Sequence, residues 1–163
     1  VVILLVQVFL IDNIDLGSSL SIWIRPMIFS LIVLMLPTSW RTVWVLLTSY
    51  IVAIIMDLLL GGAGIYAITL LPLALFRSTL IYLTTRRSVD GGDQQQMLSR
   101  MPLGQLMLYI AVSLLIYHTL FFVMETLSTA NIMRLIATIF FSSLCSLLIS
   151  WPIVRIFTSK VVA

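Results

Sequence analysis

Apolar runs separated by short polar stretches divide the chain into six segments. They are Val1–Ile11, Leu20–Leu36, Val43–Leu60, Ile65–Leu83, Leu103–Met124 and Ile132–Phe157. A helix needs about 20 predominantly apolar residues to cross the hydrocarbon core of a bilayer. None of the segments shows the strict alternation of a membrane β-strand. The pattern therefore predicts an all-α, polytopic membrane protein, a six-transmembrane-helix bundle that forms one domain over residues 1–163.

The first segment is shorter than the others. Val1–Ile11 has only 11 residues, which is roughly 16 Å of helix and about half of a hydrocarbon core. We therefore expect the first helix to be clipped at its N-terminus. The polar stretch Thr84–Pro102 is the only long loop that the pattern predicts. Its composition is typical of a solvated connector, and the alternative is a docking site for a cytoplasmic partner.

Composition and charge support this class and suggest an orientation. Hydrophobic residues make up 61% of the chain and charged residues only 9%, whereas a soluble domain has about 25% charged residues. The connections on one side hold Arg41, Arg86, Arg87, Arg100, Arg155 and Lys160, and those on the other hold Asp12, Asp15 and Glu125. The positive-inside rule then predicts cytoplasmic N- and C-termini and a cytoplasmic loop at 84–102. Because the basic residues are scattered between spans, the net charge does not indicate nucleic-acid binding.

Asp57 is the most unusual residue within a predicted span. A carboxylate at the centre of a membrane helix costs about 2.5–3.5 kcal/mol on insertion scales, so it needs a partner, a polar cavity or a function. Ser49, Ala53, Asp57 and Gly61 are spaced by four residues and share one helix face. This stripe of small and polar residues is expected to face protein, together with Gly64 in the turn that follows.

Depth arithmetic suggests a partner for Asp57. Asp57 is expected roughly 5 Å below the outer face, and Arg25 roughly 7 Å below it on the preceding helix. We therefore expect an Asp57–Arg25 pair, with Arg77 as the alternative partner, and a second outer pair between Glu125 and Arg134. These pairs either compensate buried charge and fix helix register, or line a polar pocket that opens to the outer face.

Arg77 has no carboxylate at its own predicted depth. We expect its side chain to snorkel toward the inner headgroups, and the alternative is that it donates to backbone carbonyls inside the bundle.

The last segment carries serines at a spacing of four: Ser142, Ser146 and Ser150. Small residues at this spacing allow close approach of helices. We expect a packing face within the subunit, and the alternative is a face that binds a partner or a second copy.

The residues do not indicate an enzyme. His118 and Cys145 are the only histidine and cysteine, and no group of residues has the spacing of zinc ligands. Gly61–Gly64 resembles the glycine-serine-glycine signature of rhomboid proteases, but Ala63 replaces the serine nucleophile. We therefore expect no catalytic residue, no cofactor and no metal site.

One stretch resembles a known family. Pro37 and Arg41 precede an apolar helix that ends in Asp57, then come Gly61–Gly64, Ile65, Tyr66 and Ala67, and Arg77 closes the pattern. This order resembles the bacterial rod shape-determining protein MreD, and it covers about 42 residues. The segment before Asp57, Val-Ala-Ile-Ile-Met, has fewer glycines than that family leads one to expect.

The resemblance implies a non-catalytic scaffold subunit in the bacterial inner membrane that supports peptidoglycan synthesis and cell shape. It implies binding to the bitopic protein MreC and association with a RodA-type glycosyltransferase and a class B penicillin-binding protein. It also implies an indirect link to the MreB filament, and contact with membrane lipid.

The same family is similar in helical architecture to the substrate-binding S-components of energy-coupling-factor transporters. The alternative function is therefore a small-molecule-binding subunit of such a transporter. The predicted outer connections are short, which favours the scaffold, because a transporter subunit needs a loop that closes over its ligand.

Overall fold

The structure is a computed structural model that describes residues 2–11, 24–85, 101–126 and 132–162. Most of the predicted cytoplasmic loop, with Arg86, Arg87 and Arg100, and the outer acidic residues Asp12 and Asp15 lie outside these ranges. Every element within the described ranges is helical. The all-α class is therefore confirmed for the described part of the chain.

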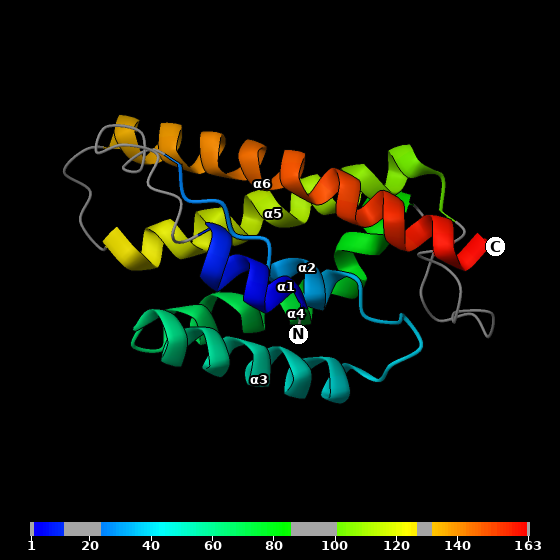
Figure 1. Cartoon of the computed structure of the whole chain (residues 1–163), viewed down its shortest axis with the longest axis horizontal. Coiled ribbons are helices and arrows are strands. Elements are labelled where there is room, and N and C mark those ends of the chain that lie inside the picture. The colour runs from blue at the N-terminus through cyan, green and yellow to red at the C-terminus, as the bar shows by residue number, and fades with distance from the viewer. Residues whose placement is uncertain (1, 12–23, 86–100, 127–131, 163) are drawn as a thin grey trace.

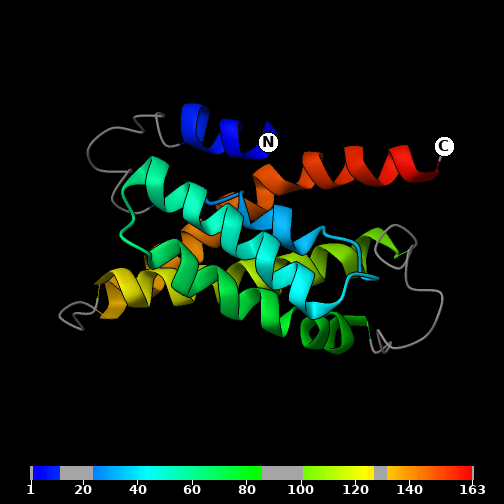
Figure 2. The same ribbon diagram turned by 90° about the horizontal axis from the view of Figure 1, so that it is seen from below.

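Four of the six predicted segments form long helices. They are α3 (Thr42–Leu60), α4 (Ile65–Thr85), α5 (Leu103–Thr126) and α6 (Ile132–Val162). Each of these four is long and apolar enough to cross a membrane. Consecutive helices pack against each other, α3 on α4, α4 on α5 and α5 on α6, and both ribbon views show α3 and α4 side by side (Figure 1, Figure 2). The prediction of a membrane protein is thus confirmed for four spans.

The first two segments differ from the prediction. The first forms α1 (Val2–Leu5) and a π-helix, η1 (Val6–Ile11). The expected helix over 20–36 is wrong, because residues 24–28 are not helical and α2 spans only Ser30–Leu34. Figure 1 shows the stretch before α2 as drawn-out chain that leads into the middle of the bundle.

Side chains from other helices satisfy the backbone of this non-helical segment, residues 24–28. On one side the N–H groups of Arg25 and Met27 donate to Ser142 Oγ at 3.1 Å and Ser146 Oγ at 2.9 Å. Residues four apart on a helix are separated by about 6 Å along its axis, and alternate residues of an extended chain by about 6.6 Å. The spacing of the two serines therefore matches the spacing of the two N–H groups.

Gln7 serves the opposite side of the same segment. Its Oε1 accepts from Ile28 N at 2.8 Å, and its Nε2 donates to Pro26 O at 3.1 Å. Irregular backbone at membrane depth is tolerated only where protein satisfies it. Pro26 has no N–H of its own, so it removes one donor that the bundle would have to satisfy.

α2 lies at the centre of the bundle and contacts α3, α4 and α5. Phe29, just before α2, makes edge-to-face contacts with Tyr66 of α4 and Tyr117 of α5, at centroid distances of 5.5 and 5.6 Å. The spanning window of α5 is 50% buried and that of α4 is 44% buried, but those of α3 and α6 are only 22% buried. The outer helices α3 and α6 therefore present most of their apolar side chains to lipid.

Candidate functional sites

Asp57 binds the N-terminus of the next helix. Its Oδ1 accepts from Gly64 N at 3.0 Å and Tyr66 N at 3.2 Å, and its Oδ2 accepts from Ala67 N at 3.2 Å. These N–H groups belong to the first turn of α4, where they have no carbonyl within the helix to bind. A carboxylate there also interacts favourably with the positive end of the helix dipole. Asp57 thus caps α4 from the last turn of α3.

The glycines after Asp57 make this cap possible. Gly61 ends α3 with φ +68° and Gly64 precedes α4 with φ +92°, a region in which glycine is favoured. Gly62 meets a different constraint, because a Cβ there would lie 2.5 Å from Asp57 Oδ1 and 2.5 Å from the Tyr66 ring. The sequence from Asp57 to Ala67 is therefore one structural unit, which we call the Asp57 turn.

The predicted Asp57–Arg25 pair is wrong. Arg25 forms its ion pair with Glu125 at the end of α5, and its guanidinium lies 5.9 Å from the centroid of the Phe121 ring. The depth argument placed Arg25 on a regular helix, whereas it lies in the non-helical segment and extends toward α5. Glu125, which the sequence paired with Arg134, instead binds Arg25, and Arg134 is exposed in the first turn of α6.

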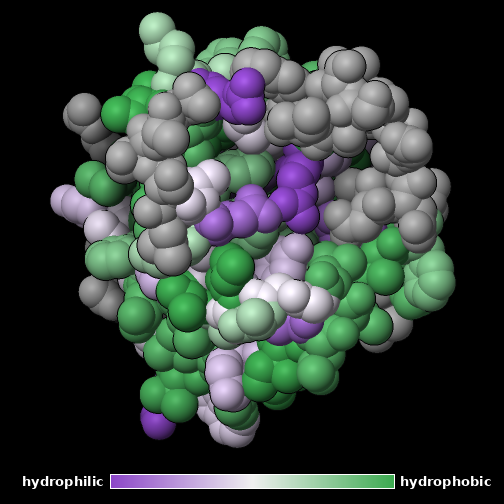
Figure 3. Space-filling view, turned by 90° about the vertical axis from the view of Figure 1, so that its left-hand side faces the viewer, coloured by the Kyte–Doolittle hydropathy of each residue, from purple (hydrophilic) through white to green (hydrophobic). Residues whose placement is uncertain are grey.

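The Asp57 turn, Arg25 and Glu125 lie at the same end of the bundle, which we call the Gly-turn end. Figure 3 views this end and shows hydrophilic side chains gathered at the centre of a hollowed face, with hydrophobic side chains over much of its lower part. The Arg25 and Glu125 side chains are 45% and 32% exposed. This ion pair is therefore accessible from outside the bundle.

His118 joins the serine face of α6 to α5 inside the core. His118 Nδ1 lies 2.8 Å from Leu114 O, and Ser146 Oγ lies 3.2 Å from Nε2. A carbonyl only accepts, so Nδ1 carries the proton and Nε2 accepts from the serine hydroxyl. Ser146 thus accepts from Met27 N and donates to His118. This arrangement ties three elements together and gives His118 a structural role.

The small-residue positions lie inside the subunit. Ser49, Ala53, Ser142, Ser146 and Ser150 are completely buried. Ser49 and Ser150 each donate to a backbone carbonyl of their own helix, those of Val45 and Ser146. Because packing within the chain already covers these faces, a partner helix would have to contact a different surface.

Arg77 is buried at the opposite end of the bundle. Its side chain is only 5% exposed, and its terminal nitrogens donate to the carbonyls of Leu36 and Pro37, just after α2. The expectation that it snorkels is wrong, and the alternative of backbone carbonyl acceptors is what the structure shows. A cation near the C-terminal end of a helix also interacts favourably with the helix dipole.

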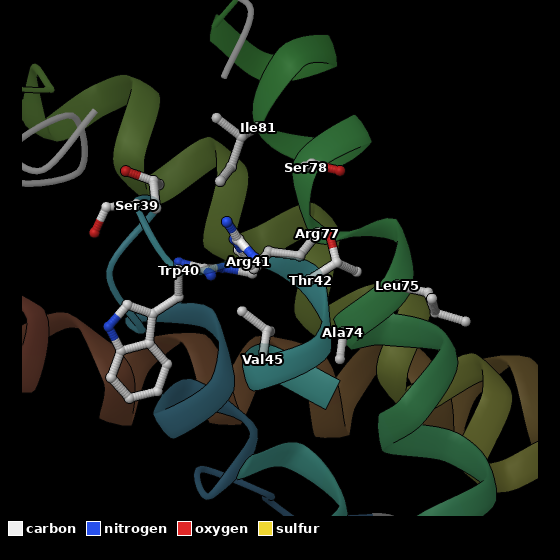
Figure 4. Close-up of a pocket in the computed structure, with 11 residues that line it drawn as sticks. Ser39, Trp40, Arg41, Thr42, Val45, Ala74, Leu75, Arg77, Ser78 and Ile81 are labelled. Carbon is white, nitrogen blue, oxygen red and sulfur yellow. The ribbon is translucent and has the colours of Figure 1, made fainter. Parts of the chain in front are cut away.

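Arg77 lines a pocket of about 300 Å³ between α3, α4 and the connection 35–41. Figure 4 shows Arg77 and Arg41 pointing toward the same region, with Thr42 and Val45 below them and Ser78 and Ile81 on α4. We call this end the pocket end. Nothing in the sequence indicated that Arg41 and Arg77 line the same pocket.

Sequence reasoning missed Gln7. Its side chain is 1% exposed and binds both Pro26 O and Ile28 N. The available signal was a polar amide inside an otherwise apolar run, Val1–Ile11, because a buried amide needs partners for its donor and acceptor.

No protein-family model matches the chain, and no curated protein and no solved structure is similar to it. The residues and their geometry are therefore the basis for the functional argument.

Proposed function

We propose that this chain is a non-catalytic integral membrane scaffold of the bacterial cell-wall elongation machinery, a member of the MreD family in the inner membrane. It would bind an MreC-like bitopic protein and, through the complex, support a RodA-type glycosyltransferase and a class B penicillin-binding protein. Its N- and C-termini would be cytoplasmic, which places the Gly-turn end outside and the pocket end inside.

The Asp57 turn is the observation that carries this proposal. The residues that carry the resemblance are Asp57, the glycines, Tyr66 and Ala67, and in this chain they form one cap of three hydrogen bonds between α3 and α4. The residues of the motif thus serve one structural purpose in this chain, the cap that Asp57 makes on α4.

The polar side chains inside the bundle also support a scaffold. Asp57, His118, Ser146 and Gln7 each bind backbone or side-chain groups of another element. Groups that bind in this way fix the relative positions of helices. A rigid bundle with apolar outer helices is suited to holding the membrane helix of a partner.

Copurification tests the proposal. The purified membrane protein is used as bait in mild detergent, and mass spectrometry identifies the proteins that accompany it, with a denaturing detergent as the control. We expect a single-span coiled-coil protein and cell-wall synthases. Recovery of a transmembrane coupling subunit with two ATPases would contradict the scaffold and support the transporter alternative.

The transporter alternative has one observation in its favour, the accessible Arg25–Glu125 pair at the Gly-turn end. A zwitterionic small molecule could bind between the two side chains, with its anionic group on Arg25 and its cationic group on Glu125. If this alternative holds, Glu125→Gln would abolish uptake of that molecule in cells. If the scaffold holds, the same variant would keep rod shape, because neither side chain of the pair belongs to the apolar outer surface of α3 and α6.

A further inference from the structure

The pocket end holds positive charge that no acidic side chain among the described lining residues neutralises. The pocket has eleven lining residues, and neither Asp nor Glu is among them, but both Arg41 and Arg77 are. Its other polar members are Thr38, Ser39, Thr42 and Ser78. Two guanidinium groups with hydroxyls around them form a set of hydrogen-bond donors that suits an oxyanion.

Arg77 is the charge that most needs a counter-ion. Its side chain is 95% buried, and the groups that it contacts are neutral, namely two backbone carbonyls and the Tyr109 hydroxyl. Within the described residues its Nε has no hydrogen-bond partner. A buried charge is costly unless it is paired and its donors are satisfied. An anion in the pocket would supply both.

The start of α3 adds donors at the same place. Arg41 is the N-cap residue of α3 and makes no side-chain cap. Thr42 and Val43 open the helix, so their N–H groups have no carbonyl acceptor within it. The N-terminus of a helix favours an anion through these groups and through its dipole. α3 has 19 residues, so its dipole is that of a full-length helix.

We propose that this pocket binds the phosphate group of an anionic phospholipid, between Arg41 and Arg77 at the start of α3. The proposal does not rest on the scaffold function. Arg41 is exposed and Arg77 is buried, so the two would contact the phosphate from the open and the closed side of the pocket.

The rest of the pocket favours a lipid over a soluble phosphate. Val45, Ala74 and Ile81 form apolar lining, and Leu75 is 50% exposed beside them on α4. Trp40 is 43% exposed at the mouth, and tryptophan is enriched where headgroups meet the hydrocarbon core. An acyl chain could therefore lie against α4 while its phosphate stays on the arginines. Basic pockets between membrane helices are known to bind anionic headgroups.

Native mass spectrometry of the purified protein tests this site. The protein is released from micelles that contain either phosphatidylglycerol or phosphatidylcholine, and retained lipid is counted at increasing lipid concentration. We expect retention of phosphatidylglycerol in preference to phosphatidylcholine. Arg41→Gln should weaken retention about tenfold, which corresponds to about 1.4 kcal/mol and to one hydrogen bond to a charged group.

Two variants provide the controls. Arg155→Gln removes one exposed arginine from α6 that does not line the pocket, and it should retain lipid as the unchanged protein does. Arg41→Lys keeps the charge but loses the bidentate geometry of the guanidinium group. Its retention of phosphatidylglycerol should therefore lie between that of the unchanged protein and that of Arg41→Gln. Arg41 is exposed, so these variants should fold normally, whereas Arg77→Gln is a secondary test because it alters the core.

The proposal is overturned if Arg41→Gln retains phosphatidylglycerol as well as the unchanged protein does. It is also overturned if Arg155→Gln loses as much lipid, since binding would then reflect overall charge alone. A parallel titration with inorganic phosphate, read as a shift in thermal unfolding, distinguishes the source. An Arg41-dependent shift without lipid retention would assign the pocket to a soluble phosphate and contradict the lipid.

Discussion

The two ends of the bundle treat charge in different ways. At the Gly-turn end the two acids that the structure describes have partners within the chain: Asp57 has the first turn of α4, and Glu125 has Arg25. At the pocket end Arg77 has only neutral partners among the described residues, and Arg41 lines the same pocket. The comparison shows that a helix terminus can take the place of a side chain of opposite charge. It also shows that Arg77 at the pocket end, unlike Asp57 and Glu125, keeps a hydrogen-bond donor without a partner among the described residues.

Loss of the Asp57 carboxylate should have the largest effect on stability. Asp57→Ala would leave three N–H groups of α4 without an acceptor, and we expect a loss of about 2–3 kcal/mol in the free energy of unfolding. Unfolding in mixed micelles by a denaturing detergent measures this. Asp57→Asn is the matched control, because its amide oxygen can still accept from Gly64 N and Tyr66 N while its NH2 faces Ala67 N. Its free energy of unfolding should lie between that of the unchanged protein and that of Asp57→Ala.

A Cβ at Gly62 should be the next most damaging change at the Gly-turn end. Gly62→Ala would place the new atom 2.5 Å from Asp57 Oδ1, and overpacking of this kind costs about 1–3 kcal/mol. Gly104→Ala is the control, because a Cβ at Gly104 in α5 would meet no atom within 4 Å. Gly104→Ala should be neutral or slightly stabilising in the same unfolding experiment. Equal effects of the two changes would contradict the close contact at Gly62.

Ser146→Ala should weaken the middle of the bundle, between the two ends. It would leave Met27 N and His118 Nε2 without their partner, at a cost of about 1–2 kcal/mol. Ser143→Ala is the control, since Ser143 Oγ donates only to Phe140 O on its own helix at 2.9 Å, and its cost should stay within about 0.5 kcal/mol. Thermal unfolding of the two variants in one detergent compares them directly.

A double-mutant cycle should give the smallest effect and separate the two kinds of partner. Arg25→Ala and Glu125→Ala should couple by about 0.5–1 kcal/mol, because the pair is partly exposed. Arg25→Ala and Asp57→Ala should add without coupling, since the two residues serve different partners. Coupling between Arg25 and Asp57 that exceeds the Arg25–Glu125 coupling would reverse the assignment of partners made here.

Hydropathy predicted the four long helices well, because the backbone N–H and C=O groups of a helix bind each other. Such a helix needs only apolar side chains to cross a membrane. The observed starts at Thr42, Ile65, Leu103 and Ile132 lie within one residue of the predicted ones. The same reasoning failed at residues 20–36. An apolar run has the same hydropathy whether it is a helix or a non-helical stretch whose N–H groups are satisfied by distant serines.

The partners at the candidate sites were predictable only where they were local. Asp57 is followed within ten residues by the N–H groups that it binds, so an acid before a glycine-rich turn and a helix could have been interpreted as a cap. Arg25 binds a residue 100 positions away, and Arg77 binds carbonyls 40 and 41 positions away. Depth along an assumed helix cannot identify such partners, because the direction of the chain between them is unknown.

The serine contacts of the non-helical segment have a consequence for how the protein is made. Arg25 and Met27 obtain their hydrogen-bond acceptors from residues 117 and 119 positions later. A ribosome that adds about 5–20 residues per second reaches Ser142 and Ser146 roughly 10 s after the segment has left it. During this interval those two donors must bind water or the insertion machinery. The non-helical segment therefore obtains its final hydrogen bonds only after α6 has been made.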